Sequence, residues 1–322
     1  MNKLYIPLFI TIFSVSLFAQ VKENSSTKTK EEPTTETNIE STQEDLLSLL
    51  GDDESKNQIN YAAASFKTTR IINGHSLETT LRGVLDARIN HRFGFINKGI
   101  EDLFGLDDAF IRIGADYGIT DRLTVGLGRN SVEKVLDGFI KYKILHQSTG
   151  KVNMPITLVV VSNIDLITST KFNPELSDYF WTRSFYTNQL LIGRKISEGT
   201  SIQFMPTLVH RNYVKTNTES NDVFLIGVAG RQKLTKRLSL NAEYYYALPN
   251  QLAPNIRNSL SIGLDIETGG HVFQLFFSNS KGTDHRSFLT DTTNSWSNRE
   301  IGFGFNVSRV FTLVKPKELR KN

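Results

Sequence analysis

Hydrophobic and polar residues alternate with a period of two along most of the chain beyond Leu77. The clearest example runs from Leu81 to Phe93, where the odd positions are mostly apolar or small and the even positions are mostly charged. A period of two is the signal of a β-strand with unlike faces. The run is about twice as long as a typical strand of a soluble sheet. It suits a strand that crosses a bilayer at a tilt.

The same alternation recurs as far as Arg309 and predicts about twelve strands, an even number as in single-chain bacterial barrels. Clear repeats lie at 109–117, 123–128, 140–144, 238–246, 260–267 and 301–308, and weaker ones at 155–165, 184–196, 201–211, 223–232 and 271–279. In a bilayer every backbone amide needs a partner, which a closed barrel supplies. The sequence therefore predicts an all-β fold, an antiparallel up-and-down transmembrane β-barrel.

The predicted connections differ in length in a regular way. Short segments such as GITDR, SEGT and TGG follow even-numbered strands, whereas longer ones such as 94–108, 166–183 and 280–298 follow most odd-numbered strands. The connection at 130–133 is the exception. Outer-membrane barrels have short periplasmic turns and longer extracellular loops. We therefore expect both chain ends in the periplasm.

The first residues resemble a secretory leader. Lys3 precedes an apolar run from Leu4 to Phe18, and Ala19 follows. This run is shorter than the roughly 20 residues of a spanning helix and has the layout of a signal peptide. We predict cleavage after Ala19 and delivery to the cell outer membrane, with a retained membrane anchor as the alternative.

The chain then divides into a linker, a barrel and a tail. Residues 20–60 are dominated by Ser, Thr, Lys, Glu and Asn, a composition that predicts a flexible polar linker. Within it, a Leu-rich island from Leu46 to Leu50 ends at Gly51 and predicts a short helix. That helix is either transient or a docking or plug element. The resulting division is signal peptide 1–19, linker 20–60, barrel 61–311 and basic periplasmic tail 312–322.

Composition excludes several kinds of chemistry. The chain has no cysteine, so disulfides, thiolate metal sites and a lipoprotein anchor are excluded. A net charge of +4 is too small to indicate nucleic-acid binding. We find no phosphate loop, nucleophile elbow or paired-histidine motif. We predict no catalytic, cofactor or metal site and no enzymatic activity, with a barrel lipase or protease as the weakest alternative.

Four segments carry a resemblance to a known family. They are LLGDDE, SFKTTRIINGHSLET, LRGVLDARINHRFG and GLDDAFIRIGADYGITDRLTVGLGR. Together with the stretch from about Phe66 to Phe311, they resemble an outer-membrane barrel family of the Bacteroidota that is known only as a domain of unknown function, the 5777-type β-barrel. The resemblance implies a barrel in the outer membrane and assigns no catalytic residue.

The polar face of the predicted strands supplies the candidate functional residues. Its charge indicates a wet lumen rather than a dry core. The candidate lumen-lining residues are Arg82, Asp86, Arg88, Asn90, Arg92, Arg112, Asp116, Lys141, Lys143, Arg231, Glu243, Asp265 and Glu267. In a conducting pore these charges would set selectivity. In a closed barrel they would pair across the lumen and lock it.

Two functions therefore stay open. One is a narrow channel for small polar solutes, with glycines such as Gly114, Gly126, Gly263 and Gly302 leaving space. The other is a non-conducting structural or partner-binding barrel. The expected partners are outer-membrane lipid, a small polar solute, and a periplasmic partner bound through the N-terminal linker.

One further segment, GFINKGIEDLFGL at 94–106, has a roughly helical apolar stripe. It predicts a helix that constricts the pore, lies on the outer leaflet or packs on the rim.

Overall fold

A closed barrel accounts for most of the chain in the computed structural model, which describes residues 58–169, 180–214, 216–217 and 219–314. Its strands follow the order β10-β11-β12-β13-β14-β2-β3-β4-β5-β7-β8-β9, and each neighbouring pair is antiparallel. The twelve-strand antiparallel barrel that the alternation predicts is confirmed. The predicted signal peptide, nearly all of the predicted linker with its Leu-rich helix, and nearly all of the predicted tail lie outside the described residues.

The strand bounds follow the alternating runs closely. They are β2 (Val84–Phe95), β3 (Ala109–Gly118), β4 (Leu123–Asn130), β5 (Leu136–Leu145), β7 (Thr157–Leu166), β8 (Ser184–Lys195), β9 (Thr200–Arg211), β10 (Asp222–Lys233), β11 (Leu238–Ala247), β12 (Ser259–Thr268), β13 (His271–Ser278) and β14 (Gly302–Thr312). The last strand pairs with the first, from Thr312 opposite Val84 to Gly302 opposite Phe95. This pairing closes the barrel and leaves no free edge.

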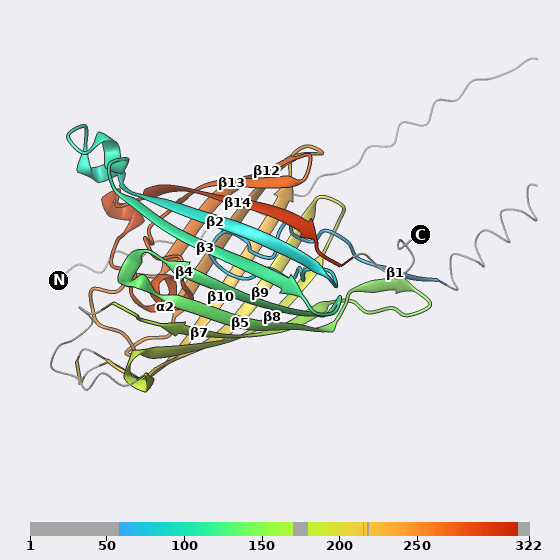
Figure 1. Cartoon of the computed structure of the whole chain (residues 1–322), viewed down its shortest axis with the longest axis horizontal. Helices are drawn as coiled ribbons and strands as arrows, with labels where there is room; N and C mark the ends of the chain where they lie inside the picture. The colour runs from blue at the N-terminus through green and yellow to red at the C-terminus, as the bar shows by residue number, and fades with distance from the viewer. Residues whose placement is uncertain (1–57, 170–179, 215, 218, 315–322) are drawn as a thin grey trace, which may run out of the picture. The chain divides into compact units, whose positions relative to one another are not determined.

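The two ends of the barrel differ, as the predicted connections indicate. Short turns join β3 to β4, β8 to β9, β10 to β11 and β12 to β13. We call this the short-turn end, and the opposite one the long-loop end. At the short-turn end a small two-stranded sheet forms outside the barrel, in which β1 (Ile59–Tyr61) pairs with β6 (Ser148–Gly150) from the β5–β7 connection. Figure 1 shows this sheet to the right of the barrel.

The long-loop end carries the short helices. They are η1 (Ile96–Lys98), η2 (Leu103–Gly105), η3 (Val132–Lys134), η4 (Trp181–Arg183), α2 (His285–Thr290) and η5 (Trp296–Asn298). Within the described part of the chain, no helix has the length and apolar content to cross a membrane.

The helix predicted over 94–106 does not form as one element. Gly99, with φ 73° and ψ −165°, ends η1, and Phe104, with φ 56°, departs from helical geometry inside η2, so only two short turns form. Ile100 is 80% exposed, and Leu103 and Phe104 are also exposed. The segment projects from the long-loop end (Figure 1) and does not fold into the lumen.

The occluded lumen as candidate functional site

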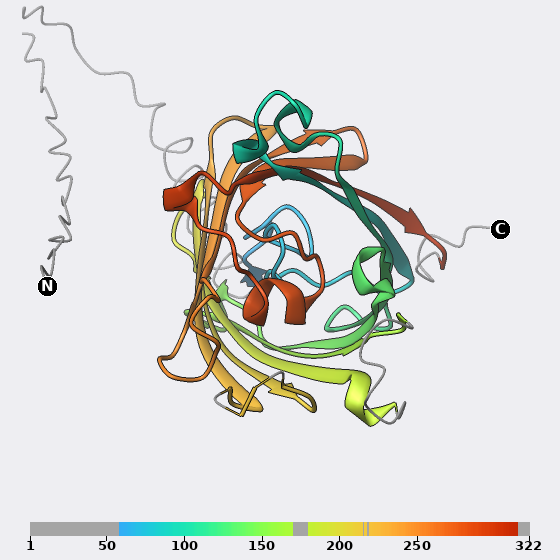
Figure 2. The same ribbon diagram turned by 90° about the vertical axis from the view of Figure 1, so that its left-hand side faces the viewer.

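Residues 65–80, which precede the first barrel strand, lie inside the barrel. We call them the lumen segment. Their centre is a tight turn in which the Ile71 amide donates to the Gly74 carbonyl at 2.8 Å and the Ser76 amide donates to the Thr69 carbonyl at 3.1 Å. The Asn-Gly pair at 73–74 is a strong turn signal. Figure 2, which looks in from the long-loop end, shows this stretch in blue within the barrel.

The carboxylate of Glu243 anchors the tip of the turn. It accepts hydrogen bonds from the backbone amides of Asn73, at 2.7 Å, and Gly74, at 3.1 Å. Arg92 donates to the Asn73 side-chain oxygen at 2.7 Å. A Cβ atom at position 74 would lie 1.8 Å from the Tyr245 hydroxyl oxygen, so this close approach requires glycine.

Wall side chains satisfy the carbonyls of the lumen segment. Gln274 donates to Ile71 at 2.7 Å, Asn306 to Ile72 at 3.0 Å and Gln203 to His75 at 2.8 Å. Lys141 donates to Thr69 at 3.2 Å. A buried carbonyl without a partner is costly, so these amides and this ammonium stabilise irregular backbone inside the barrel.

The charges around the lumen segment are paired. Arg70 contacts Asp116 at 3.2 Å, Arg88 contacts Asp86 at 2.9 Å and Arg112 contacts Asp137 at 2.5 Å, and all six side chains are buried. The Asp116 carboxylate also accepts from the Thr69 hydroxyl at 2.7 Å. The Arg70–Asp116 pair joins the lumen segment to β3, whereas the other two pairs lie within the wall.

A buried apolar cluster occupies part of the lumen, which was expected to be wet. Ile71, Ile72 and Leu77 of the lumen segment belong to one buried cluster with inward side chains of β7 to β11. The wall members are Val159, Val161, Leu191, Met205, Val209, Val223, Leu225, Ala229 and Tyr245. Strands β7 to β10 are four of the five strands whose alternation is weak in the sequence, and β13 is the fifth. Their inward faces mix apolar residues that pack in the lumen, such as Val161 and Leu191, with polar ones such as Gln203.

The β13–β14 loop folds inward as a second occluding element. In it, Asp284 caps α2 by accepting from the Ser287 amide at 3.1 Å, and every residue of α2 is buried. The Arg286 amide donates to Asp165 on β7 at 2.9 Å. The Phe288 ring lies 5.4 Å from the Tyr245 ring. Figure 2 shows this helix within the barrel mouth, in front of the lumen segment.

Little space remains between the two occluding elements. The cavity there measures about 10 Å³ and is lined by Arg70, Asn73, Asn90, Arg92, Arg112, Asp137, Thr283 and His285. That volume holds about one water molecule. A larger vestibule of about 530 Å³ opens between the lumen segment and the β12–β14 and β2 wall, next to the short turns.

Three of the four glycines expected to leave space for solutes make room for large side chains instead, and the fourth lies against backbone. A Cβ at Gly114 would lie 2.7 Å from the Arg112 guanidinium, and one at Gly126 would lie 2.1 Å from the Phe139 ring. Gly263 lies beside Phe276 in the same way, and Gly302 faces the backbone at Gly94. Neighbouring side chains and backbone therefore occupy the space beside these glycines, and none of the four leaves an opening for a solute.

The structure places most candidate lumen residues on the inner wall. Buried and inward are Asp86, Arg88, Asn90, Arg92, Arg112, Asp116, Lys141, Lys143, Arg231, Glu243 and Asp265. Glu267 lies at the vestibule, where it pairs with Lys67. The prediction that Arg82 lines the lumen is wrong, because Arg82 precedes β2 and its side chain is exposed.

Several important lumen residues were not among the candidates predicted from the sequence. Asp137 and Asp165 are inward residues of β5 and β7 that the alternation could have indicated. His75 and His285 lie outside the barrel strands, where no periodic pattern marks them. Among the described residues, no group of three His, Cys, Asp or Glu side chains is arranged to hold a metal ion.

Comparisons with known proteins concern the barrel as a whole. The model of the family described as "Membrane bound beta barrel domain (DUF5777)" matches residues 66–311. No curated protein matches the chain.

Solved structures that resemble it include the NanC porin, with 9% identity, a TM-score of 0.44 and coverage of 70% of this chain and 98% of the porin. Omp33 of Acinetobacter baumannii has 7% identity and a TM-score of 0.40, covering 72% and 99%. LpxR from Salmonella typhimurium has 11% identity and a TM-score of 0.33, covering 71% and 99%. Similarity this low carries no argument about function.

Proposed function

This chain belongs to the family of membrane-bound β-barrel domains, and from that premise we propose that it is a sealed outer-membrane barrel that binds partners at its ends. The alternative, a channel for small polar solutes, has less support. The observation that carries the proposal is the filled lumen. The lumen segment and α2 meet inside the barrel and leave a cavity of about 10 Å³ between them.

The span of the family match supports the lumen segment as part of the domain. The match begins at Phe66, within the lumen segment, and ends at Phe311 on β14. The segment thus belongs to the same unit as the wall that binds it. Its carbonyls, its two tip amides and its charges have specific partners on β2, β3, β5, β9, β11, β13 and β14. A segment bound in this way supports a permanent seal rather than a loosely held constriction.

The route of the chain out of the lumen supports a partner at the short-turn end. β1 is held there by its pairing with β6 and by the Tyr61 ring stacked on His146 at 4.8 Å. Lys195 at the β8–β9 turn donates to the Ala63 carbonyl at 3.1 Å. The described chain therefore leaves the barrel at this end. In our proposal it faces the periplasm, and the linker and the basic tail hold a periplasmic partner there.

Planar-bilayer recording on the purified full-length protein tests the proposal. We expect no discrete conductance steps from inserted, folded protein. A variant that lacks both residues 66–79 and residues 283–292 should conduct. This positive control would show that the assay detects an open form of this barrel. Steps from the unmodified protein that change when Arg112→Gln is introduced would support the solute channel instead. The proposal includes no catalytic step, cofactor or metal.

A further inference from the structure

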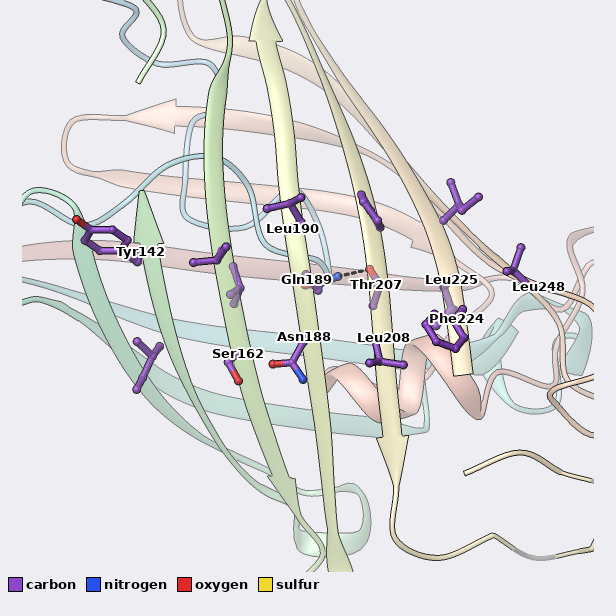
Figure 3. Close-up of a pocket in the computed structure, with 15 residues that line it drawn as sticks. Tyr142, Ser162, Asn188, Gln189, Leu190, Thr207, Leu208, Phe224, Leu225 and Leu248 are labelled. Atoms are coloured by element: carbon purple, nitrogen blue, oxygen red, sulfur yellow. Dashed lines mark hydrogen bonds between the residues drawn. The ribbon is translucent and has the colours of Figure 1, made fainter. Parts of the chain in front are cut away.

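Two polar side chains interrupt the apolar outer wall at mid-strand. Ser162 on β7 and Asn188 on β8 are directly opposite in the ladder, and both point outward and are exposed. Their neighbours on the same face are apolar, with Val160 and Ile164 on β7 and Leu190 on β8. Figure 3 shows the two side chains together on adjacent strands.

Neither polar group is satisfied within the described part of the chain. No hydrogen bond to the Ser162 hydroxyl or the Asn188 amide is found there, whereas Gln189, the inward neighbour, donates to Thr207 at 3.0 Å. Acyl chains offer no donor or acceptor, so lipid leaves these groups unpaired. Unpaired polar groups in hydrocarbon are costly and commonly mark contacts between membrane proteins.

The shape of the wall around this pair is concave. Two hollows of about 710 and about 720 Å³ flank it, and Ser162 borders both. Ala115 and Gly138, two small residues that face outward, line the second hollow. Small residues at a lipid-facing surface allow close approach of another transmembrane element.

A proline adds an irregularity at the same place. Pro206 on β9 faces the first hollow, and the β8–β9 ladder skips from Gln189–Thr207 to Ile192–Phe204. Proline has no amide hydrogen to donate, so the backbone there lacks ladder bonds that the rest of the wall has. Polar side chains, an interrupted ladder and two hollows thus coincide on one face formed by β5, β7, β8 and β9.

We propose that this face binds a second copy of the chain, with Asn188 and Ser162 of each copy hydrogen-bonded to those of the other. A two-fold axis along the membrane normal keeps every residue at its own depth. A polar pair at mid-strand then meets the same pair at the same depth in the other copy. A carboxamide is both donor and acceptor and can therefore pair with itself. The proposal is independent of whether the lumen conducts.

Disulfide cross-linking in native outer membranes tests the dimer, and the absence of cysteine from the sequence makes single-cysteine variants unambiguous. Asn188→Cys should yield a disulfide-linked species of twice the monomer mass under mild oxidation. Leu275→Cys is the matched control, because Leu275 is outward and exposed at mid-strand on β13, on a distant part of the wall. It should stay monomeric. Resistance of each variant to unfolding in cold SDS verifies folding.

A second measurement separates a specific interface from random collision. In vesicles at increasing lipid dilution, the dimer of Asn188→Leu should have a dissociation constant about tenfold higher than that of the unmodified protein. This is the effect expected when one or two hydrogen bonds between the two copies are lost within the membrane. Leu275→Ala should leave dimerisation unchanged. Equal cross-linking at 188 and 275, a monomer at both positions, or a cross-linked species containing a different protein would each overturn the proposal.

Discussion

The imidazole rings of His75 and His285 stack, with centroids 4.8 Å apart and planes 14° apart. His75 belongs to the lumen segment and His285 to α2, so the two occluding elements meet at this contact. The His75 Nε2 atom bonds the Asn163 side chain at 3.1 Å. His75 Nδ1 and His285 Nε2 are buried and accept or donate no hydrogen bond among the residues that the structure describes. The contact therefore depends on both rings being neutral.

Acid should loosen the seal through these two rings. Burial, with the Arg70 cation nearby, lowers the pKa of both the His75 and the His285 imidazole well below the usual 6.5. The docked state thus disfavours protonation, and Lys141 beside His75 adds to the repulsion. Docking should be strongest above about pH 6.5 and should weaken progressively as the pH falls below that value.

Hydrogen exchange of the peptide covering 65–80, corrected for its intrinsic pH dependence, measures this effect between about pH 8 and about pH 5. Protection should fall at the lower pH. The double substitution His75→Gln with His285→Gln should reduce the pH dependence, whereas His210→Gln, at an exposed surface histidine, should not. Unchanged protection across the range would contradict this role of the rings.

Glu243 should contribute more to docking than any exposed acid at the vestibule. Glu243→Ala leaves two buried amides, of Asn73 and Gly74, without their acceptor, at roughly 1–3 kcal/mol for each. The control Glu267→Gln removes a partly exposed ion pair with Lys67, worth about 0–1 kcal/mol. Urea unfolding of both variants gives the two free-energy differences, and equal losses would show that the tip amides do not need Glu243.

Trypsin should distinguish the lumen segment from the residues before it. Arg70 is buried and paired with Asp116, and the Lys67 side chain is mostly covered. Trypsin should therefore not cut the peptide bonds after Lys67 and Arg70 in the folded protein. Cleavage before Ile59, for instance at Lys56, should leave a protected fragment that begins upstream of the lumen segment. Mass spectrometry of the core fragment decides the point, and cleavage after Arg70 under native conditions would refute the buried position.

The sequence predicts the wall of this barrel far better than its contents. Alternation reports which face of a strand meets lipid, and it located all twelve strands. It also suggested that inward charges such as Arg112 and Asp116 lie on one face. The partners of those charges were not predictable, because Arg70 and Asp137 meet them only once the barrel closes. Weak alternation in β7 to β10 has a structural cause, since apolar inward residues such as Val161 and Leu191 on these strands pack inside the lumen.

The occluding segments were missed for a related reason. Residues 65–80 have no period, and their contacts, such as Asn73 with Glu243 and Ser261, join positions far apart in the chain. The Asn-Gly turn after Ile71 and Ile72 was the available signal. Of the three placements expected for a helix over 94–106, the inward constriction is wrong, because the apolar residues of this segment are exposed at the long-loop end. The polar loop around Asp284 folds inward instead.

The filled lumen also changes what a new charge should do on either side of β2. Ile89 is outward and exposed at mid-strand, so Ile89→Arg should destabilise the barrel by about 2–4 kcal/mol, the cost of a cation at the bilayer midplane. Leu85→Arg, on the same face near the strand end, should cost about 0–1 kcal/mol. In an open pore, Asn90→Arg would be tolerated because water would surround the side chain at position 90. In this barrel Asn90 is buried, donates a hydrogen bond to Asn306 at 2.8 Å and lies next to the Arg112 guanidinium. An added cation at position 90 therefore has neither space nor water. We expect its cost to match or exceed that of Ile89→Arg. Unfolding free energies of the three variants in lipid vesicles test the order, and a negligible loss for Asn90→Arg would indicate that the lumen is hydrated at that level.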